Sequence, residues 1–515
     1  MLARRVIAAG AGAALALIGP AAVTVAAGPD PDLGRFYQQK IGWAACRPKE
    51  GQTGELLDSV REMECGTLSV PIDYAHPGNG AISLAVSRFK TSARGSDRKG
   101  SVVFNFGGPG ASGVDGLAGF RAEAAGIGKH YDLVSFDPRG VARSSPVHCG
   151  GEGAASRLEG ERPNPPGTAA AAVDEAKRIA RACHDKTGPL LDHVGTINAS
   201  RDMDVLRQAL GDSKLNYLGI SYGTRLGAVY ASQFPKKTGR MVLDAVDTLQ
   251  GTAKQDALTQ TKGFQQALDA FFAGCAQQNC ELGSSPQEVR ATFDKAVALL
   301  ADGRVVTSAG NQDFTGAELQ SAVRSALYSQ SSWPVLSSGI AALLQDSDPS
   351  VLVSINDAMQ DALPDNANEA LLAINCADDP ERPADPVKEF DDVRKQLAAE
   401  SPYFGPDSAG RAVACTGWPA GTDYIRRIDH PGAPKILVVG GKGDPATPYQ
   451  WAQDTAQRLG SGVLLTYEGE GHGAYSASQC IRAKVDAFFA AGTVPREGTS
   501  CPAEVPDEGA EVPDE

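Results

Sequence analysis

The stretch Leu215-Asn-Tyr-Leu-Gly-Ile-Ser-Tyr-Gly-Thr224 places Ser221 between Gly219 and Gly223. A short apolar run ends at this serine, and a helical pattern follows at once, with small residues on one side. A strand, a sharp turn and a helix in this order are typical of a nucleophilic serine at a strained corner. Such a corner tolerates only small residues two positions before and after the serine. The motif is short, so the surrounding chain has to decide what it means.

Length and composition restrict the class of protein. A chain of 515 residues predicts either several domains or one domain with a large insertion. Hydrophobic residues at 42% and charged residues at 21% are typical of a globular protein. The formal charge of -14 argues against nucleic acid or an anionic membrane as the main partner.

The N-terminus has the pattern of a secretory signal peptide. Arg4 and Arg5 precede an apolar run over residues 6–18, and Val25-Ala26-Ala27 offers a small-residue cleavage site. The run is shorter than the roughly 20 residues of a membrane span, and no second long apolar run follows. We therefore expect residues 1–27 to be a signal peptide and the chain to be secreted without membrane insertion. The arginine pair leaves twin-arginine export open, and a buried N-terminal helix is the alternative to a signal peptide.

The chain has ten cysteines, an even number that fits an oxidising compartment and up to five disulfides. The sequence does not fix their connectivity, and pairing of neighbours along the chain is the simplest hypothesis. Zinc is the competing interpretation, but the sequence contains neither Cys-x-x-Cys nor His-Glu-x-x-His. We predict no metal site.

Strand and helix patterns alternate before and after a long helical stretch. Two alternating segments predict a leading hairpin, and short apolar runs predict buried parallel strands. The hairpin segments are 67–71 and 82–89, and the buried strands are 102–106, 131–136, 215–220, 240–244, 435–441 and 463–467. Helices are predicted over 168–184, 199–210, 448–459 and 478–490, the second capped near Asn198 or Ser200.

These patterns predict an α/β protein with one large insertion. We expect residues 28–45 to form an N-terminal arm or propeptide, 46–247 the first part of the core and 431–501 the second part. Residues 248–430 form a mostly helical cap, with helices over 261–274, 285–300 and 333–345. The acidic residues 502–515 are predicted to be a disordered tail.

A serine nucleophile needs a histidine that removes its proton and a carboxylate that orients the histidine. On sheets of this kind the chain order is serine, acid, histidine. Only His430 and His472 follow Ser221. His430 precedes a strand, whereas His472 lies in a glycine-rich loop just after the last strand, so His472 is the predicted base.

The predicted acid is Asp444, which follows the preceding strand and can meet His472 at the carboxyl ends of the sheet. A turn aspartate before proline is the alternative interpretation. The oxyanion of acyl transfer requires two donors. We expect the Tyr222 N–H to be one, and the bare backbone at Gly107-Gly108 to supply the other, although a tight turn after a strand also explains these glycines.

Six motifs together resemble the secreted tripeptidyl aminopeptidases of the α/β-hydrolase fold, relatives of the proline iminopeptidases. They are Asn105-Phe-Gly-Gly-Pro-Gly-Ala-Ser-Gly113, Asp137-Pro-Arg-Gly140, Gly219-Ile-Ser-Tyr-Gly-Thr224, Asn375-Cys-Ala-Asp378, Gly443-Asp-Pro-Ala-Thr-Pro448 and Gly471-His-Gly473. The resemblance covers about residues 46–501 and implies Ser221 as nucleophile, Asp444 as acid, His472 as base, and Gly108 with Tyr222 as oxyanion donors. It implies no cofactor. Phe106 departs from the family, where iminopeptidases carry histidine and tripeptidyl enzymes usually proline.

The resemblance also implies a substrate with a free N-terminus. Recognition of its ammonium requires a carboxylate at a fixed distance from the scissile carbonyl. Asp378 and Asp379 are our candidates, with a Cys376–Cys415 pairing as their anchor; solvated loop acids are the alternative. A carboxylesterase or lipase with the same triad is the rival enzyme, and a catalytically silent envelope binding protein is the rival from another class. The sequence does not predict the oligomeric state.

Overall fold

The computed structural model describes residues 33–49, 52–150, 168–301, 304, 306–307 and 313–504. The predicted signal peptide therefore lies outside the described residues, as does the end of the acidic tail from residue 505. The described residues contain one ten-stranded sheet and one small two-stranded sheet. In spatial order the large sheet consists of β1 (Ala44–Ala45), β2 (Glu64–Pro71), β3 (Ala81–Phe89), β5 (Asp132–Phe136), β4 (Ser101–Asn105), β6 (Leu215–Ile220), β7 (Thr238–Asp244), β10 (Ile436–Gly443), β11 (Gly462–Glu470) and β12 (Ser500–Cys501).

The large sheet has an antiparallel edge and a parallel body. The pairs β1–β2, β2–β3 and β3–β5 are antiparallel, and every pair from β5 to β12 is parallel. The hairpin and the buried parallel strands are thus confirmed, and with them the α/β-hydrolase fold. Because the carboxyl ends of parallel strands meet at one edge, the loops after β6, β10 and β11 are brought together there.

Helices cover both faces of the large sheet, and each face has its own hydrophobic core. One core includes buried side chains of α6, α7, α8 and α16, and the other those of α2, α3, α4, α17 and α18. The core helices are α1 (Gly34–Tyr37), α2 (Gly54–Glu62), α3 (Gly113–Gly119), α4 (Ala125–Gly128), α6 (Ala169–Thr187), α7 (Thr196–Leu210), α8 (Tyr222–Gln233), α16 (Tyr449–Leu459), α17 (Ala474–Ala477) and α18 (Gln479–Ala491). Short 3-10 helices lie at η1 (Pro77–Asn79), η2 (Gly95–Asp97) and η3 (Gly188–His193).

The cap is the part of the chain between β7 and β10. It has a hydrophobic core of its own, which includes Phe264, Phe271 and Phe293. Its elements are α9 (Ala253–Gln277), α10 (Pro286–Leu299), β8 (Val306–Thr307), β9 (Asp313–Phe314), α11 (Gly316–Ala326), η5 (Gln330–Ser332), α12 (Trp333–Asp346), α13 (Ser350–Asp361), α14 (Ala367–Asp378), α15 (Pro386–Glu400), η6 (Pro406–Val413) and η7 (Ile425–Arg427). The three predicted cap helices are confirmed, although α9 begins eight residues before its predicted start, at a capping box formed by Thr252 and Gln255.

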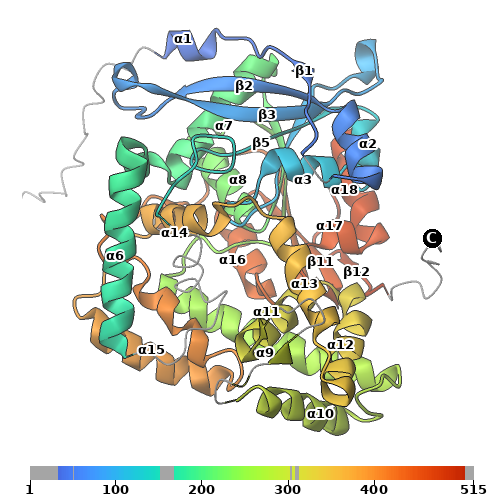
Figure 1. Cartoon of the computed structure of the whole chain (residues 1–515). Helices are drawn as coiled ribbons and strands as arrows, with labels where there is room; N and C mark the ends of the chain where they lie inside the picture. Colours follow the sequence, from blue (N-terminus) through green and yellow to red (C-terminus); the bar gives the residue numbers. More distant parts are fainter. Residues whose placement is uncertain are drawn as a thin grey trace, which may run out of the picture.

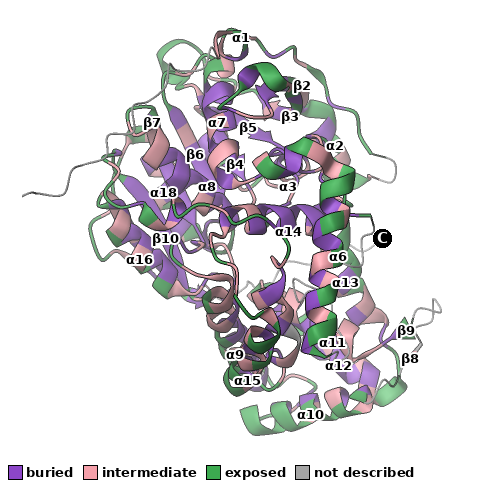
Figure 2. Cartoon of the chain, turned by 90° about the vertical axis from the view of Figure 1, so that its left-hand side faces the viewer, coloured by how far each residue is buried: buried purple, intermediate pink, exposed green. Residues whose placement is uncertain are grey.

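Helix α14 joins the cap to the sheet. Figure 1 shows the β2–β3 hairpin at one end of the molecule, helices α9 to α12 and α15 at the other, and α14 between them. Ala370, Leu372 and Ile374 of α14 are buried in the core of the sheet rather than in that of the cap. Figure 2 shows the buried strands and, at the outer end of the cap, the largely exposed α10. The carboxyl-end loops of the sheet therefore lie between two packed layers.

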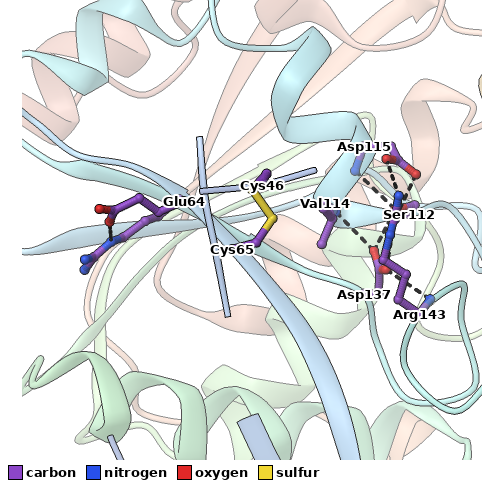
Figure 3. The surroundings of a disulfide bond; sticks show 9 residues. Cys46, Glu64, Cys65, Ser112, Val114, Asp115, Asp137 and Arg143 are labelled. Atoms are coloured by element: carbon purple, nitrogen blue, oxygen red, sulfur yellow. Dashed lines mark hydrogen bonds and ion pairs between the residues drawn. A yellow bond between two sulfur atoms is a disulfide. The ribbon is translucent and has the colours of Figure 1, made fainter. Parts of the chain in front are cut away.

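Five disulfides link the ten cysteines, and neighbour pairing is confirmed. The pairs are Cys46–Cys65, Cys149–Cys183, Cys275–Cys280, Cys376–Cys415 and Cys480–Cys501. The first pair joins the chain after β1 to strand β2 (Figure 3). No helix among the described residues is long and apolar enough to span a membrane.

One local prediction was wrong, and one residue of the predicted tail has a defined place in the structure. Helix α7 begins at Thr196 with Gly195 as its N-cap, not near Asn198 or Ser200, because the Thr196 N–H donates to Asp378 of α14 at 2.8 Å. In the predicted tail, the carboxylate of Glu504 accepts the N–H groups of Gln479 and Cys480 at the start of α18, and the residues beyond Glu504 lie outside the described part of the chain. In both cases a distant carboxylate satisfies the free N–H groups of a helix end.

Candidate active site

Ser221 lies at a strained turn between β6 and α8. Its φ of 58° and ψ of -127° place a residue with a side chain in the left-handed half of backbone space. A Cβ added to Gly219 would lie 2.3 Å from the Gly223 carbonyl oxygen, and one added to Gly223 would lie 2.7 Å from the Asn105 carbonyl oxygen. Glycine is therefore required on both sides of the serine by close backbone contact.

The turn is anchored on both sides of Ser221. The Ser221 N–H donates to the Asp244 carbonyl at 3.0 Å, and the Thr224 hydroxyl donates to the Ser221 carbonyl at 2.6 Å. The backbone of Ser221 is thus fixed by β7 and α8, while Ser221 lines two cavities.

Asp444 and His472 meet at the carboxyl ends of β10 and β11. His472 Nδ1 lies 3.0 and 2.9 Å from the two carboxylate oxygens of Asp444, so Nδ1 carries the proton of the neutral imidazole and Nε2 is its unprotonated nitrogen. The N–H groups of Ala446 and Thr447 donate to Asp444 at 2.9 and 2.8 Å, and the Thr447 hydroxyl donates at 2.8 Å. The carboxylate is therefore held in place from three sides.

The surroundings of His472 favour its protonated form. Burial alone would lower the pKa of this imidazole, but the charge and hydrogen bond of Asp444 outweigh burial and raise the pKa, with smaller contributions from Asp244 and Asp247. The cap also contacts His472 through Tyr328. The backbone N–H of His472 donates to the Tyr328 carbonyl at 2.8 Å, and the Tyr328 ring packs edge-on against the imidazole at 5.2 Å between centroids.

Asp244 is a buried carboxylate that the sequence analysis missed. It ends β7 and accepts the N–H groups of Ala474 and Tyr475 at 3.1 and 2.8 Å, two and three residues after His472. Burial raises the pKa of Asp244 to about 6, against these hydrogen bonds and the charge of His472. A charged residue at the carboxyl end of a buried parallel strand is the signal that could have identified it.

The glycine loop after β4 lies against the serine turn. Gly107 and Gly108 have φ values of 87° and 99°, and a Cβ on Gly107 would lie 2.8 Å from Ser221 Cβ. No acceptor among the described residues pairs with the N–H groups of Gly108 and Tyr222. Both groups are thus available to an oxyanion at the serine.

The Asp137-Pro-Arg-Gly140 motif holds this loop and its neighbours in place. Asp137 accepts the Ser112 hydroxyl at 2.7 Å and the Val114 N–H at 3.1 Å, at the start of α3 (Figure 3). Arg139 is fully buried and forms a bidentate pair with Asp202 of α7, at 2.6 and 2.7 Å. The motif is therefore an anchor for the glycine loop and α7.

One cavity at Ser221 is rich in charged side chains, and we call it the charged cavity. It is lined by Gly108 and Ser221, by four carboxylates and by three guanidinium groups. The carboxylates are those of Asp247, Asp256, Asp378 and Asp379, and the guanidinium groups those of Arg225, Arg411 and Arg426. Arg225 lies one turn after Ser221 on α8 and pairs with Asp247 at 3.0 Å.

The two predicted substrate-binding residues, Asp378 and Asp379, line this cavity, but both already have partners. Asp378 accepts the N–H and hydroxyl of Thr196, at 2.8 and 2.5 Å. Asp379 accepts from Arg426 at 3.1 Å and from the Glu381 N–H at 2.9 Å. Protein groups thus bind both oxygens of Asp378, whereas both bonds to Asp379 go to its Oδ1.

Asp256 of α9, which the sequence analysis did not single out, differs from these two residues. No group among the described residues donates a hydrogen bond to its side chain. Burial raises the pKa of Asp256 to about 7; Arg225 opposes the shift and Asp247 adds to it. The charged cavity thus contains one carboxylate without a donor of its own.

Comparison with known proteins agrees with this architecture. Residues 401–501 match a family model described as TAP-like protein. The chain is 33% identical to serine protease Hip1 of Mycobacterium tuberculosis, over 95% of this chain and 96% of that protein. It is 32% identical to tripeptidyl aminopeptidase of Streptomyces lividans, over 86% and 84% of the two chains. Carboxylesterase B of Mycobacterium tuberculosis is 33% identical, over 89% of each chain.

These similarities extend over nearly the whole chain, and the serine turn, the glycine loop and the Asp444–His472 pair occupy the positions expected of an α/β-hydrolase. The protein therefore belongs to the TAP-like family of α/β-hydrolases and is a serine hydrolase.

Proposed function

We propose that the protein is a secreted serine exopeptidase that releases short peptides, most simply tripeptides, from free N-termini. The observation that carries this proposal is the charged cavity beside Ser221, in which four carboxylates face three guanidinium groups. Carboxylates in a cavity that the nucleophile also lines suit a substrate that carries an ammonium group. Five disulfides support an oxidising, extracellular location.

In the proposed reaction Ser221 Oγ attacks the scissile carbonyl while His472 Nε2 takes its proton. Asp444 holds the imidazole in the required tautomer and stabilises the imidazolium. The Gly108 and Tyr222 N–H groups donate to the oxyanion. The tetrahedral intermediate collapses to an acyl-enzyme, and His472 returns the proton to the departing amine. Water, activated by the same histidine, then releases the peptide acid.

We assign the substrate ammonium to the charged cavity. Asp378 and Asp379 supply negative charge there, although Thr196 already binds both oxygens of Asp378 and Arg426 binds Oδ1 of Asp379. Asp256 has no donor among the described residues and is free to make the direct contact. An ammonium bound here defines how many residues fit between the N-terminus and the scissile bond.

The test compares purified protein with its Ser221→Ala variant on four substrates: a free tripeptidyl arylamide, an aminoacyl arylamide, an N-acetylated tripeptidyl arylamide and a short-chain ester. We expect the free tripeptidyl arylamide to be turned over fastest, and Ser221→Ala to abolish that turnover. Equal rates on the free and acetylated arylamides would contradict recognition of the N-terminus.

An esterase is the second candidate, because carboxylesterase B has the same 33% identity to this chain as serine protease Hip1, over 89% rather than 95% of the chain. Turnover of the ester alone would favour it, since the same triad serves both chemistries. Absence of turnover on all four substrates would favour a binding protein that keeps the hydrolase fold.

A further inference from the structure

Ser221 also lines a second cavity, separate from the charged cavity but joined to it at the nucleophile. Gly108, Pro109, Ser221 and Leu371 line both cavities. The second cavity has a volume of about 650 Å³, against about 140 Å³ for the charged cavity. Ser221 therefore lies where the two cavities meet.

Two cap helices form the wall of the second cavity opposite Ser221. Ser321, Arg324, Ser325 and Tyr328 lie at spacings of three and four residues, so one face of α11 and the turn after it faces this space. Asn356 and other residues of α13 form the adjoining wall. Gln360, Asp361 and Asp365, which also line the cavity, are exposed, so this space reaches the surface.

Proton transfer decides which part of a substrate belongs here. The amine that leaves Ser221 has to receive its proton from His472, and so it departs on the side of that imidazole. Tyr328 of the cap touches His472 through its ring and its carbonyl, and Tyr328 lines the second cavity but not the charged one. The departing amine is therefore directed toward the second cavity.

The second cavity also contains an unused polar group. Asn356 is 8% exposed, and its amide nitrogen donates to the Glu318 carbonyl at 3.0 Å, which fixes the orientation of the amide. Its buried Oδ1 has no donor among the described residues. An acceptor left free in this way costs free energy unless a water or a ligand N–H pairs with it. A peptide backbone N–H is a suitable donor.

We propose that the second cavity is the binding site for the leaving peptide, with Asn356 Oδ1 accepting one of its backbone N–H groups. This inference rests on the proposed function. The acyl part with its ammonium lies in the charged cavity, the scissile bond lies at Ser221, and the chain beyond it follows the face of α11 to the surface. The substrates are then extended peptides or protein N-termini rather than only tripeptide derivatives.

The test uses two substrates with the same free tripeptidyl acyl group, one with a small arylamine and one with a seven-residue peptide as leaving group. Ser325→Trp places a bulky side chain on the cavity face of α11. The matched control is Ser354→Trp, an exposed position of α13 that does not line the cavity. Thermal unfolding of both variants monitors folding.

We expect Ser325→Trp to lower kcat/KM for the extended peptide about tenfold more than for the arylamide, because only the former needs the space. Asn356→Leu, which removes the acceptor at similar volume, should act in the same direction by several-fold. Ser354→Trp should leave the ratio of the two kcat/KM values unchanged. An unchanged ratio in Ser325→Trp would overturn the inference while leaving the proposed function intact. Failure of the unmodified protein to cleave either substrate would instead overturn the proposed function, and the inference with it.

Discussion

Among single residues, Asp256 gives the most specific prediction, because its ionisation should make recognition of the substrate ammonium depend on pH. Its pKa is raised to about 7, so the carboxylate that would hold the ammonium is the main form above that pH and the minor form below it. A peptide N-terminus is itself charged below about pH 8. Preference for the free over the acetylated tripeptidyl arylamide should therefore rise as the pH increases through about 7 and fall again above about 8. The ratio of the two kcat/KM values measures this preference, because the titration of His472 affects both substrates equally.

The matched substitution is Asp256→Asn, with Asp269→Asn on the exposed side of the same helix as control. Loss of a charge-assisted hydrogen bond should raise KM for the free arylamide by roughly ten- to a hundredfold and leave the acetylated one unchanged. In Asp256→Asn the ratio of kcat/KM for the free arylamide to that for the acetylated one should no longer change with pH near 7. Equal changes in KM for both substrates would show that Asp256 only supports the cavity.

Among the structural elements, α17 decides how firmly His472 is held. The Asp244 carboxylate accepts both N–H groups at the start of α17, and neither oxygen is exposed. In Asp244→Asn one backbone N–H keeps a neutral oxygen acceptor, whereas the other N–H faces the side-chain NH2 group and loses its hydrogen bond. We expect kcat to fall about tenfold with KM nearly unchanged, because a less firmly held His472 raises the activation free energy by about 1.4 kcal/mol. Steady-state kinetics on one arylamide measures both constants, and Asp429→Asn, at an exposed position, is the control. A change in KM instead of kcat would contradict this role of Asp244.

The elements also show what the sequence can predict. The strand–turn–helix at Ser221 and the positions of Asp444 and His472 followed from local patterns, because each residue directly follows a buried strand. The start of α7 did not, since the carboxylate that satisfies its Thr196 N–H lies 182 residues away on α14. For the same reason the hydrogen bonds between Asp378 and Thr196 could not be predicted from the sequence. Asp256 could not be predicted either, because it lies on a cap helix with no recognisable motif around it.

For the whole molecule, the Cys376–Cys415 disulfide ties α14 to the chain after η6, and Cys415 lines the charged cavity. It closes a loop with a sequence separation of 39 residues, which in the chain-entropy model corresponds to about 4 kcal/mol of stability. The double variant Cys376→Ser/Cys415→Ser should unfold at lower temperature. At temperatures where it remains folded, it should also lose turnover of the free arylamide more than turnover of an ester. Calorimetry and the two assays test this, and equal losses on both substrates would contradict a role for the cap in recognising the N-terminus.

The central claim is that Ser221 carries the N-terminal part of a peptide as an ester during turnover. The most direct measurement is mass spectrometry of the protein quenched with acid during turnover of a free tripeptidyl arylamide, followed by digestion. We predict that the peptide containing Ser221 gains the mass of one tripeptidyl acyl group, and that Asp444→Asn and Ser221→Ala give no such adduct. An adduct on another residue, or turnover of the arylamide by Ser221→Ala, would contradict the account.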